Sequence, residues 1–240
     1  MNKLSITSLR TSLSIERIAV YQNYIATKEP KLLPADVSIR ALDLYLWNIK
    51  VSSALLELIS LYEVTLRNRI FRIIDSEYPN SIRDEFFIRR LPPLTRDKII
   101  KLIDNLIESQ ENITNPLIVS RLSFPFWGVV LEKLFYYSGS FDENGNKVLP
   151  RLYKHNKLLF SINKKLNLED FNKLVKRLID TNIIINDLRN RICHHEPIFK
   201  SNLRVMYIKI LFSLKYLDRN VYKVAKDIER VSDILRNGVI

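Results

Sequence analysis

Apolar residues recur at helical spacing along most of this chain. The clearest stretch covers residues 36–76, which contains neither Gly nor Pro. One straight helix of that length would span roughly 60 Å at about 1.5 Å per residue, so we expect a kink or a break near residues 51–53. Its buried face is predicted to carry Leu55, Ile59, Tyr62, Leu66, Ile70 and Ile73.

The remaining pattern predicts further amphipathic helices between polar or proline-containing connectors. Ser14 is a candidate N-cap for a helix over residues 15–28. Thr95 is a candidate N-cap for a helix over residues 96–112. Three later helices are predicted over about 168–196, 203–217 and 219–236.

Aromatic residues are dense in the segment 121–137. Such rings can stack on nucleic-acid bases, but at this spacing they are more typical of a buried core. Both interpretations stay open at the level of sequence, with the core favoured. The residues concerned are Phe124, Phe126, Trp127, Phe135, Tyr136 and Tyr137.

Glycine is scarce, with 4 residues in a chain of 240. Sheets and tight hairpins use more glycine than this, so we predict an all-α fold. No linker divides the chain, and we expect a single domain over 1–240 with its core at about 36–217. Residues 1–13 are expected to be loosely ordered, and residues 138–150 form the clearest loop.

Positive charge adds a candidate partner to this helical picture. The formal net charge is +12 and the isoelectric point is about 9.7. This balance indicates an anionic partner, with nucleic acid as the first candidate, although a basic protein without such a partner is the simpler alternative. The cations expected to contact RNA are Arg67, Arg69, Arg151, Lys154, Lys164, Lys165, Lys173, Lys176 and Arg177.

Cysteine and histidine are too few for a convincing metal centre. Cys193 is the only cysteine, which excludes an internal disulfide, and it stands beside only three histidines, so we predict neither a metal nor another cofactor. The N-terminus lacks a signal-peptide pattern, and no apolar run approaches the roughly 18 residues that a membrane helix needs. We therefore expect a cytoplasmic protein without membrane association.

Candidate chemistry concentrates in residues 186–197. Arg189 and Asn190 are followed by the adjacent histidines His194 and His195. A guanidinium, an amide and an imidazole pair within about two helical turns can bind a phosphate and move protons beside it. On an ideal helix Arg189 and His194 lie about 140° apart, so either the last turn distorts or a second chain completes the site.

Pro197 limits how far this helix can extend. It disfavours helical geometry at Glu196, so we expect His194 and His195 in the final turn, where the helix dipole favours a cation. The alternative is that the two histidines merely cap the helix end.

The run Leu-Arg-Asn-Arg-Ile occurs at 188–192 and again at 66–70. The flanking residues differ, so we infer no duplication. Near the first copy, Glu63 and Arg67 are four residues apart and can pair on one helix face. An ordinary surface ion pair is the simpler interpretation of that spacing.

Residues 189–195, Arg-Asn-Arg-Ile-Cys-His-His, are similar to the Arg-Asn-x-x-x-His-His motif of Abi-like (abortive infection, AbiD/AbiF) proteins, a branch of the HEPN superfamily. Residues 63–70 resemble the Glu-x-x-Leu-Arg segment near the start of those domains. Residues 121–127 resemble the family's middle Leu-Ser-Phe-x-x-Trp segment. The three segments follow in the family's order and span roughly 40–215 of this chain.

The resemblance implies a HEPN-like helical bundle with additional helices, and metal-independent RNA cleavage. The ribose 2′-hydroxyl would attack the adjacent phosphate and leave a 2′,3′-cyclic phosphate and a 5′-hydroxyl. Matched by position, His194 would be the general acid/base, with His195 in support. Arg189 would stabilise charge on the phosphorane, Asn190 would orient the phosphate or the imidazole, and Glu63 would orient Arg189.

The resemblance also implies a role in phage defence, as a toxin restrained by a partner. The chain departs from the family at Pro125, where we expect a small residue, and at Ile198 and Phe199, where a tryptophan often stands.

Cyclising RNA cleavage needs both a base and an acid, and one histidine cannot be both at once. We therefore predict a homodimer joined near residues 186–197. Two alternatives from other classes stay open. The chain could be a non-catalytic RNA-binding module of the same fold that holds a structured non-coding RNA, or a helical interaction protein whose charge is incidental.

Overall fold

The computed structural model describes residues 12–136, 139, 150–162 and 166–238, and every regular element in those ranges is helical. The all-α prediction is confirmed. The expected loose start and most of the predicted loop at 138–150 lie outside the described residues.

Backbone packing groups the chain into two compact units, which we describe separately. Unit 1 comprises the described parts of Met1–Glu57, Arg191–Arg204 and Glu229–Ile240. Unit 2 comprises the described parts of Leu58–Asn190 and Val205–Ile228. The single domain expected from the sequence stays a prediction.

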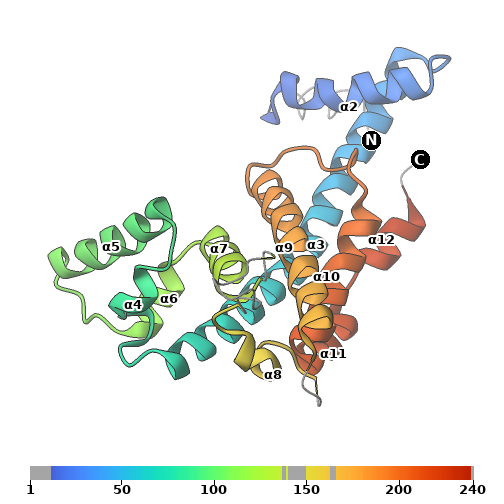
Figure 1. Ribbon diagram of the computed structural model, residues 1–240. Coiled ribbons are helices and arrows are strands. Elements are labelled where there is room, and N and C mark those ends of the chain that lie inside the picture. The colour runs from blue at the N-terminus through green and yellow to red at the C-terminus, as the bar shows by residue number, and fades with distance from the viewer. Residues whose placement is uncertain (1–11, 137–138, 140–149, 163–165, 239–240) are drawn as a thin grey trace. The chain divides into compact units, whose positions relative to one another are not determined.

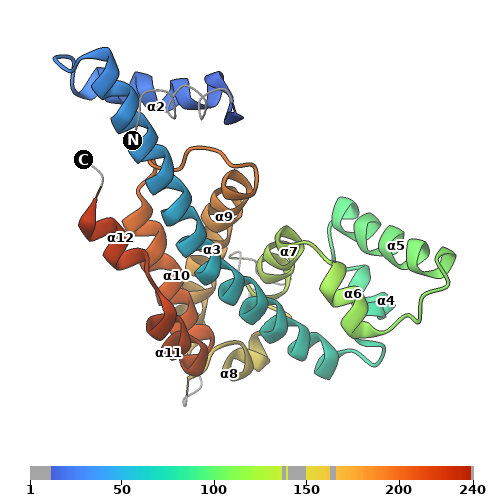
Figure 2. The same ribbon diagram turned by 180° about the vertical axis from the view of Figure 1, so that it is seen from behind.

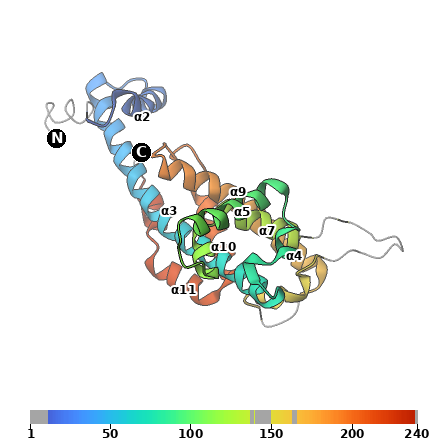
Figure 3. The same cartoon turned by 90° about the vertical axis from the view of Figure 1, so that its left-hand side faces the viewer.

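Unit 1 is built on α2 (Ile15–Lys28) and the first part of α3 (Pro34–Glu77), which lie side by side (Figures 1 and 3). α2 begins as predicted, because the Ser14 hydroxyl accepts a hydrogen bond from the N–H of Arg17 at 3.4 Å. The two helices share a core because their apolar residues recur every three or four positions. That core contains Ile18, Tyr21, Ile25, Ala41, Leu42, Leu44 and Tyr45.

α3 is one continuous helix of 44 residues, so the break expected near 51–53 is absent. No Gly or Pro interrupts its hydrogen-bond ladder in this region, and Val51, Ala54 and Leu55 are all fully buried. Packing therefore stabilises the helix through the position where length alone suggested a break.

The last described helix, α12 (Val231–Asn237), also belongs to unit 1. The indole N–H of Trp47 donates to the carbonyl of Ile234 at 3.3 Å, and Arg230 forms an ion pair with Glu57. The single helix predicted over 219–236 is wrong, because two helices occupy that range: α11 (Arg219–Ile228) ends first, and α12 follows it as a separate helix. A new helix begins at Val231, and in its first turn the N–H and the hydroxyl of Ser232 donate to the Glu229 carboxylate.

Unit 2 contains the rest of α3 and most of the later helices (Figure 1). α5 begins at Pro93, so Thr95 is buried in its first turn and is not the predicted N-cap. Proline is pre-organised for that first helical position. The elements of this part are η1 (Ser81–Arg83), α4 (Glu85–Ile88), α5 (Pro93–Glu108), α6 (Asn115–Arg121), α7 (Phe124–Phe135), η2 (Tyr153–His155), α8 (Asn156–Leu159), most of α9 (Leu168–Cys193), most of α10 (Leu203–Leu217) and α11.

The aromatic side chains of α7 form core rather than a stacking surface. Phe124, Phe126, Trp127 and Phe135 are all buried, and the Phe124 ring meets Tyr62 of α3 edge-on. Pro125 occupies the first turn of α7, where it fits without cost. Tyr137 lies outside the described residues.

α10 and α11 form a helical hairpin (Figure 2), with the Lys226 ammonium donating to the Tyr207 hydroxyl at 3.4 Å. Asp218, in the turn between them, has two roles. One carboxylate oxygen accepts from the N–H groups of Asn220 and Val221, which caps α11. The other pairs with Arg69 of α3 at 2.6 Å.

Burial alone would raise the pKa of Asp218, but the hydrogen bonds from Arg69 and from the two backbone N–H groups outweigh it and hold the pKa below its ordinary value. The charged carboxylate therefore stabilises the fold at neutral pH. That contribution is present above the ordinary aspartate pKa of about 3.9 and is lost as pH falls through the lowered pKa of the folded state.

We expect Asp218→Ala to lower the free energy of unfolding by about 2 kcal/mol, because it removes both the cap and the ion pair. Asp218→Asn keeps an oxygen for the cap and should cost about 1 kcal/mol. Urea unfolding between pH 7 and pH 3 measures both effects. The difference between wild type and Asp218→Asn should shrink at the acid end, and a constant difference would show that the charge contributes nothing.

Candidate functional site

α9 carries most of the candidate chemistry. Its start is specified locally, because the Asn167 side chain accepts from the N–H of Asp170 at 2.8 Å and the acidic Glu169 lies in the first turn. Its buried face follows the helical period. That face contains Phe171, Val175, Leu178, Ile185, Leu188 and Ile192.

Arg189 lies at the margin of that face, in unit 2. Its Nε is 3.6 Å from Oε1 of Glu63 on α3, and its Nη1 donates to the Asn190 side chain at 3.5 Å. The Arg189 side chain remains 44% exposed, whereas that of Glu63 is 25% exposed. A carboxylate from a second helix therefore holds the guanidinium while leaving much of it open to solvent.

The Glu63–Arg189 contact is an ion pair without a close hydrogen bond. Burial raises the pKa of Glu63, and the positive charges of Arg189 and Arg67 only partly oppose that effect. Oε1 of Glu63 accepts no hydrogen bond from any described residue. Arg67, the partner expected from helical spacing, donates to Asn68 instead. A loosely held guanidinium retains donors that can bind another anion.

α9 ends at Cys193, so His194 and His195 follow the helix and do not occupy its final turn as expected. His195 has a left-handed backbone with φ of 56°. Its N–H donates to the carbonyl of Ile192 at 2.9 Å, and the N–H of Glu196 donates to that of Arg191 at 2.8 Å. These two bonds define a Schellman motif, which usually has glycine at the position that His195 occupies.

The chain after this turn is held by contacts that sequence reasoning missed. Arg191 donates to the Ser201 hydroxyl at 2.9 Å and to the carbonyl of Pro197, and it lies 3.6 Å from the Glu196 carboxylate. The Arg191 guanidinium therefore holds the chain from Glu196 to Ser201 against the end of α9. The signal available in the sequence was a second arginine inside the motif.

A second anchor comes from α3. The Asn48 side-chain oxygen accepts from the N–H of Ile198 at 2.8 Å, and both residues are buried. Phe199 packs on the rings of Tyr21 and Tyr24, with centroids at 5.1 and 4.8 Å. Ile198 and Phe199, which depart from the family pattern, therefore fill unit 1 with apolar contacts.

The candidate motif crosses the division between the two units. Arg189 and Asn190 belong to unit 2, together with Glu63. His194 and His195 belong to unit 1, and both histidines are exposed. The structure thus brings Glu63, Arg189 and Asn190 together and places the histidine pair directly after the last residue of the same helix.

Several cations expected to contact RNA are already paired with carboxylates. Arg69 is bound by Asp218, and Glu77 lies 2.7 Å from Lys154, 2.9 Å from His155 and 3.8 Å from Arg151. Burial would raise the pKa of Glu77, but the hydrogen bonds from Lys154 and His155 outweigh it and lower that pKa. These pairs reduce the positive charge that the region offers to RNA. Lys164 and Lys165 lie outside the described residues.

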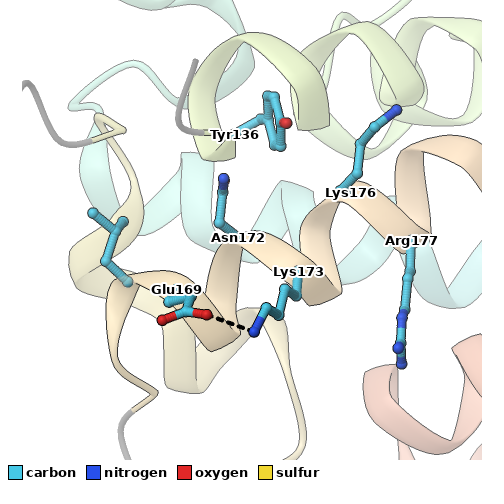
Figure 4. Close-up of a pocket in the computed structure, with 7 residues that line it drawn as sticks. Tyr136, Glu169, Asn172, Lys173, Lys176 and Arg177 are labelled. Carbon is cyan, nitrogen blue, oxygen red and sulfur yellow. Dashed lines mark hydrogen bonds and ion pairs between the residues drawn. The ribbon is translucent and has the colours of Figure 1, made fainter. Parts of the chain in front are cut away.

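A second cationic group lies along α9, where a hollow of about 650 Å³ opens beside Tyr136. Figure 4 shows Asn172 pointing toward Tyr136, and Lys173 turned back to Glu169, 2.6 Å away. Lys176 pairs with Asp180, and Arg177 stacks over the Phe212 ring at 5.3 Å. Each of these cations therefore has an internal partner, with both lysines and Arg177 exposed to solvent.

Within the described ranges, no group of three or more His, Cys, Asp or Glu side chains is arranged to hold a metal ion. No helix of the described chain is both long and apolar enough to cross a membrane. Comparisons with protein families, with curated proteins and with solved structures find no match to this chain.

The left-handed conformation of His195 generates a stability prediction. His195→Gly should maintain or raise the free energy of unfolding, because glycine adopts this conformation without strain. His195→Val should lower it by about 1–2 kcal/mol, because a β-branched side chain is least compatible with it. Chemical denaturation of both variants measures the difference. If both variants lower the free energy of unfolding equally, the left-handed backbone conformation does not determine the effect of substitution at His195.

Proposed function

We propose that this protein is a metal-independent endoribonuclease of the HEPN type. The observation that carries the proposal is the half-exposed guanidinium of Arg189, which the partly buried Glu63 of α3 holds. Arg189 lies on α9, and two exposed histidines follow directly after the end of that helix. The net charge of +12 adds a general attraction for RNA. The resemblance of residues 189–195 to the Abi-like motif supports the same assignment.

In the proposed reaction, the imidazole of His194 takes the proton from a ribose 2′-hydroxyl. The 2′-oxygen attacks the adjacent phosphorus, and the bond to the 5′-oxygen breaks. A second acid protonates the departing 5′-oxygen, which leaves a 2′,3′-cyclic phosphate and a 5′-hydroxyl. Arg189 donates hydrogen bonds to the non-bridging oxygens as their charge grows, and the Asn190 amide orients the phosphate.

Base and acid must both be present during one turnover, so we propose that two chains combine. A two-fold axis near residues 186–197 would supply two copies of His194 and two of Arg189 to one cleft. By the resemblance, His195 supports His194, and in this proposal the second proton-transfer group comes from the other chain.

The resemblance alone supports the biological setting. By that resemblance, the protein acts in the cytoplasm as a phage-defence toxin and is restrained by a partner until infection. The ion pairs that neutralise many of the predicted RNA-binding cations favour a moderate and salt-sensitive affinity for RNA.

We expect Arg189→Ala and His194→Ala each to reduce RNA cleavage by about 10²–10⁴-fold, the usual range for losing a charge-stabilising donor or an acid/base group. Arg72→Ala, which removes an exposed arginine of α3, is the matched control and should cut normally. Incubation with total RNA, followed by sequencing of the new ends, measures cleavage. Normal cutting by both motif variants would refute the site.

The same assay tests the chemistry. Cleavage should survive EDTA and should stop when the ribose at the cut is replaced by deoxyribose, because the 2′-hydroxyl is the nucleophile. A requirement for Mg²⁺ would instead indicate a metal-dependent nuclease. RNA that is bound but left intact by the wild-type protein would favour the non-catalytic RNA-binding module.

The dimer is tested by mixing two inactive proteins. Arg189→Ala and His194→Ala chains should regain part of the activity together if each cleft needs only one intact copy of each group. Either variant mixed with itself is the control and should stay inactive. Light scattering that finds only monomer, at a concentration where RNA is still cut, would contradict the dimer.

A further inference from the structure

A second hollow, of about 410 Å³, lies within unit 1 beside the histidine turn. One wall comes from α3 and includes Tyr45, Asn48, Ser53 and Leu56. The other wall comes from the end of α9, which includes Ile192, and from the turn after it, which includes His195. The volume falls in the range of small-molecule sites, and the walls are mainly apolar with a few polar groups.

Asn48 gives this hollow a specific chemistry. Its side chain is 5% exposed, and its oxygen accepts the hydrogen bond from the N–H of Ile198. Because a backbone N–H can be satisfied only by an acceptor, the orientation of the amide is fixed and Nδ2 is the atom left over. No described residue accepts a hydrogen bond from that Nδ2. Nδ2 is not among the fully buried polar atoms that lack a partner, so it is a donor that solvent or a ligand can reach.

The charges around the hollow argue against a phosphate as the occupant. Among the described residues that line it there is no lysine or arginine, and the carboxylate of Glu196 is present. A neutral, flat group with hydrogen-bond acceptors on its edge and apolar faces fits instead. Aliphatic contacts from Leu56 and Ile192 would cover the faces, while Asn48 and Ser53 would meet the edge.

We propose that this hollow binds one nucleobase of the RNA substrate. The proposal rests on the proposed function for its source of ligand, since a base belonging to RNA would place the adjoining ribose and phosphate at the His194–His195 turn. The Schellman bonds hold the wall that His195 forms, and Arg191 holds the chain that follows it. A preformed binding site of this kind would make cleavage depend on which base binds in the hollow.

Binding of uncleavable RNA tests this proposal separately from catalysis. The probes are short fluorescent 2′-O-methyl RNAs of a single base type, one for each base, and an abasic strand of equal length and charge. We expect the wild-type protein to bind at least one base-bearing strand about tenfold more tightly than the abasic strand, the effect of about one well-made buried hydrogen bond. That ratio should persist as salt rises, because no ion pair produces it.

Two variants locate the effect. Asn48→Asp keeps an oxygen for Ile198 and replaces the donor by a carboxylate, so the ratio should fall to about one. Ser53→Trp should fill the mouth of the hollow from its exposed rim and have the same effect without disturbing the Ile198 anchor. Ser60→Trp, at another exposed serine of α3 that does not line the hollow, is the matched control and should retain the ratio.

Equal binding of base-bearing and abasic strands by the wild-type protein would overturn the proposal, whether or not the protein cuts RNA. So would a ratio that Ser53→Trp leaves unchanged in a folded protein. If Ser53→Trp instead converts a dimer to a monomer and the ratio persists, the hollow binds a second chain and no base. Base-dependent binding by a protein that never cuts RNA would support this hollow while refuting the nuclease.

Discussion

Burial of one face of α3 underlies both compact units. The first part of this helix buries Ala41 and Leu44 in unit 1, and the later part buries Tyr62 and Leu66 in unit 2. Side chains three and four positions apart share a helix face, so one buried face runs along most of α3. The first part of that face belongs to the core of unit 1 and the later part to the core of unit 2. A helix owes most of its stability to such packing, which explains why α3 continues without interruption. Glu63 follows directly after Tyr62, and the packing that buries Tyr62 therefore also fixes the carboxylate that meets Arg189.

The candidate site differs electrostatically from the ion pairs made by Asp218 and Glu77. Asp218 and Glu77 are each surrounded by hydrogen-bond donors, and the pKa of each is lowered. Glu63 is partly buried with an oxygen that accepts no hydrogen bond from the described residues, and its pKa is raised. A partly buried carboxylate with a raised pKa beside an exposed arginine is typical of sites that bind a ligand. Carboxylates whose hydrogen bonds are all made within the protein more often stabilise the fold.

Helical periodicity predicted the bodies of the helices because a buried face leaves a regular trace in the sequence, as in α2 and α10. Helix ends were predicted less well, since they depend on single residues. Nothing in the sequence marks His195 as left-handed, because its conformation accompanies two backbone bonds, from the N–H of His195 to the carbonyl of Ile192 and from the N–H of Glu196 to the carbonyl of Arg191. The motif itself was visible as a short local pattern. Asn48 was not, because its partner lies 150 residues away and no local pattern joins them.

Contacts between distant parts of the chain set the order in which unit 1 can be completed during synthesis. Asn48 is 150 residues from its partner Ile198, and Trp47 is 187 residues from its partner Ile234. Chains are made from the N-terminus, so α2 and the first part of α3 emerge long before the segments that complete their unit. A ribosome-bound chain that has not reached Ile198 lacks the anchor that Asn48 provides for the segment after the histidine turn. The contacts that complete unit 1 therefore form only after the segments that carry Ile198 and Ile234 have been synthesised.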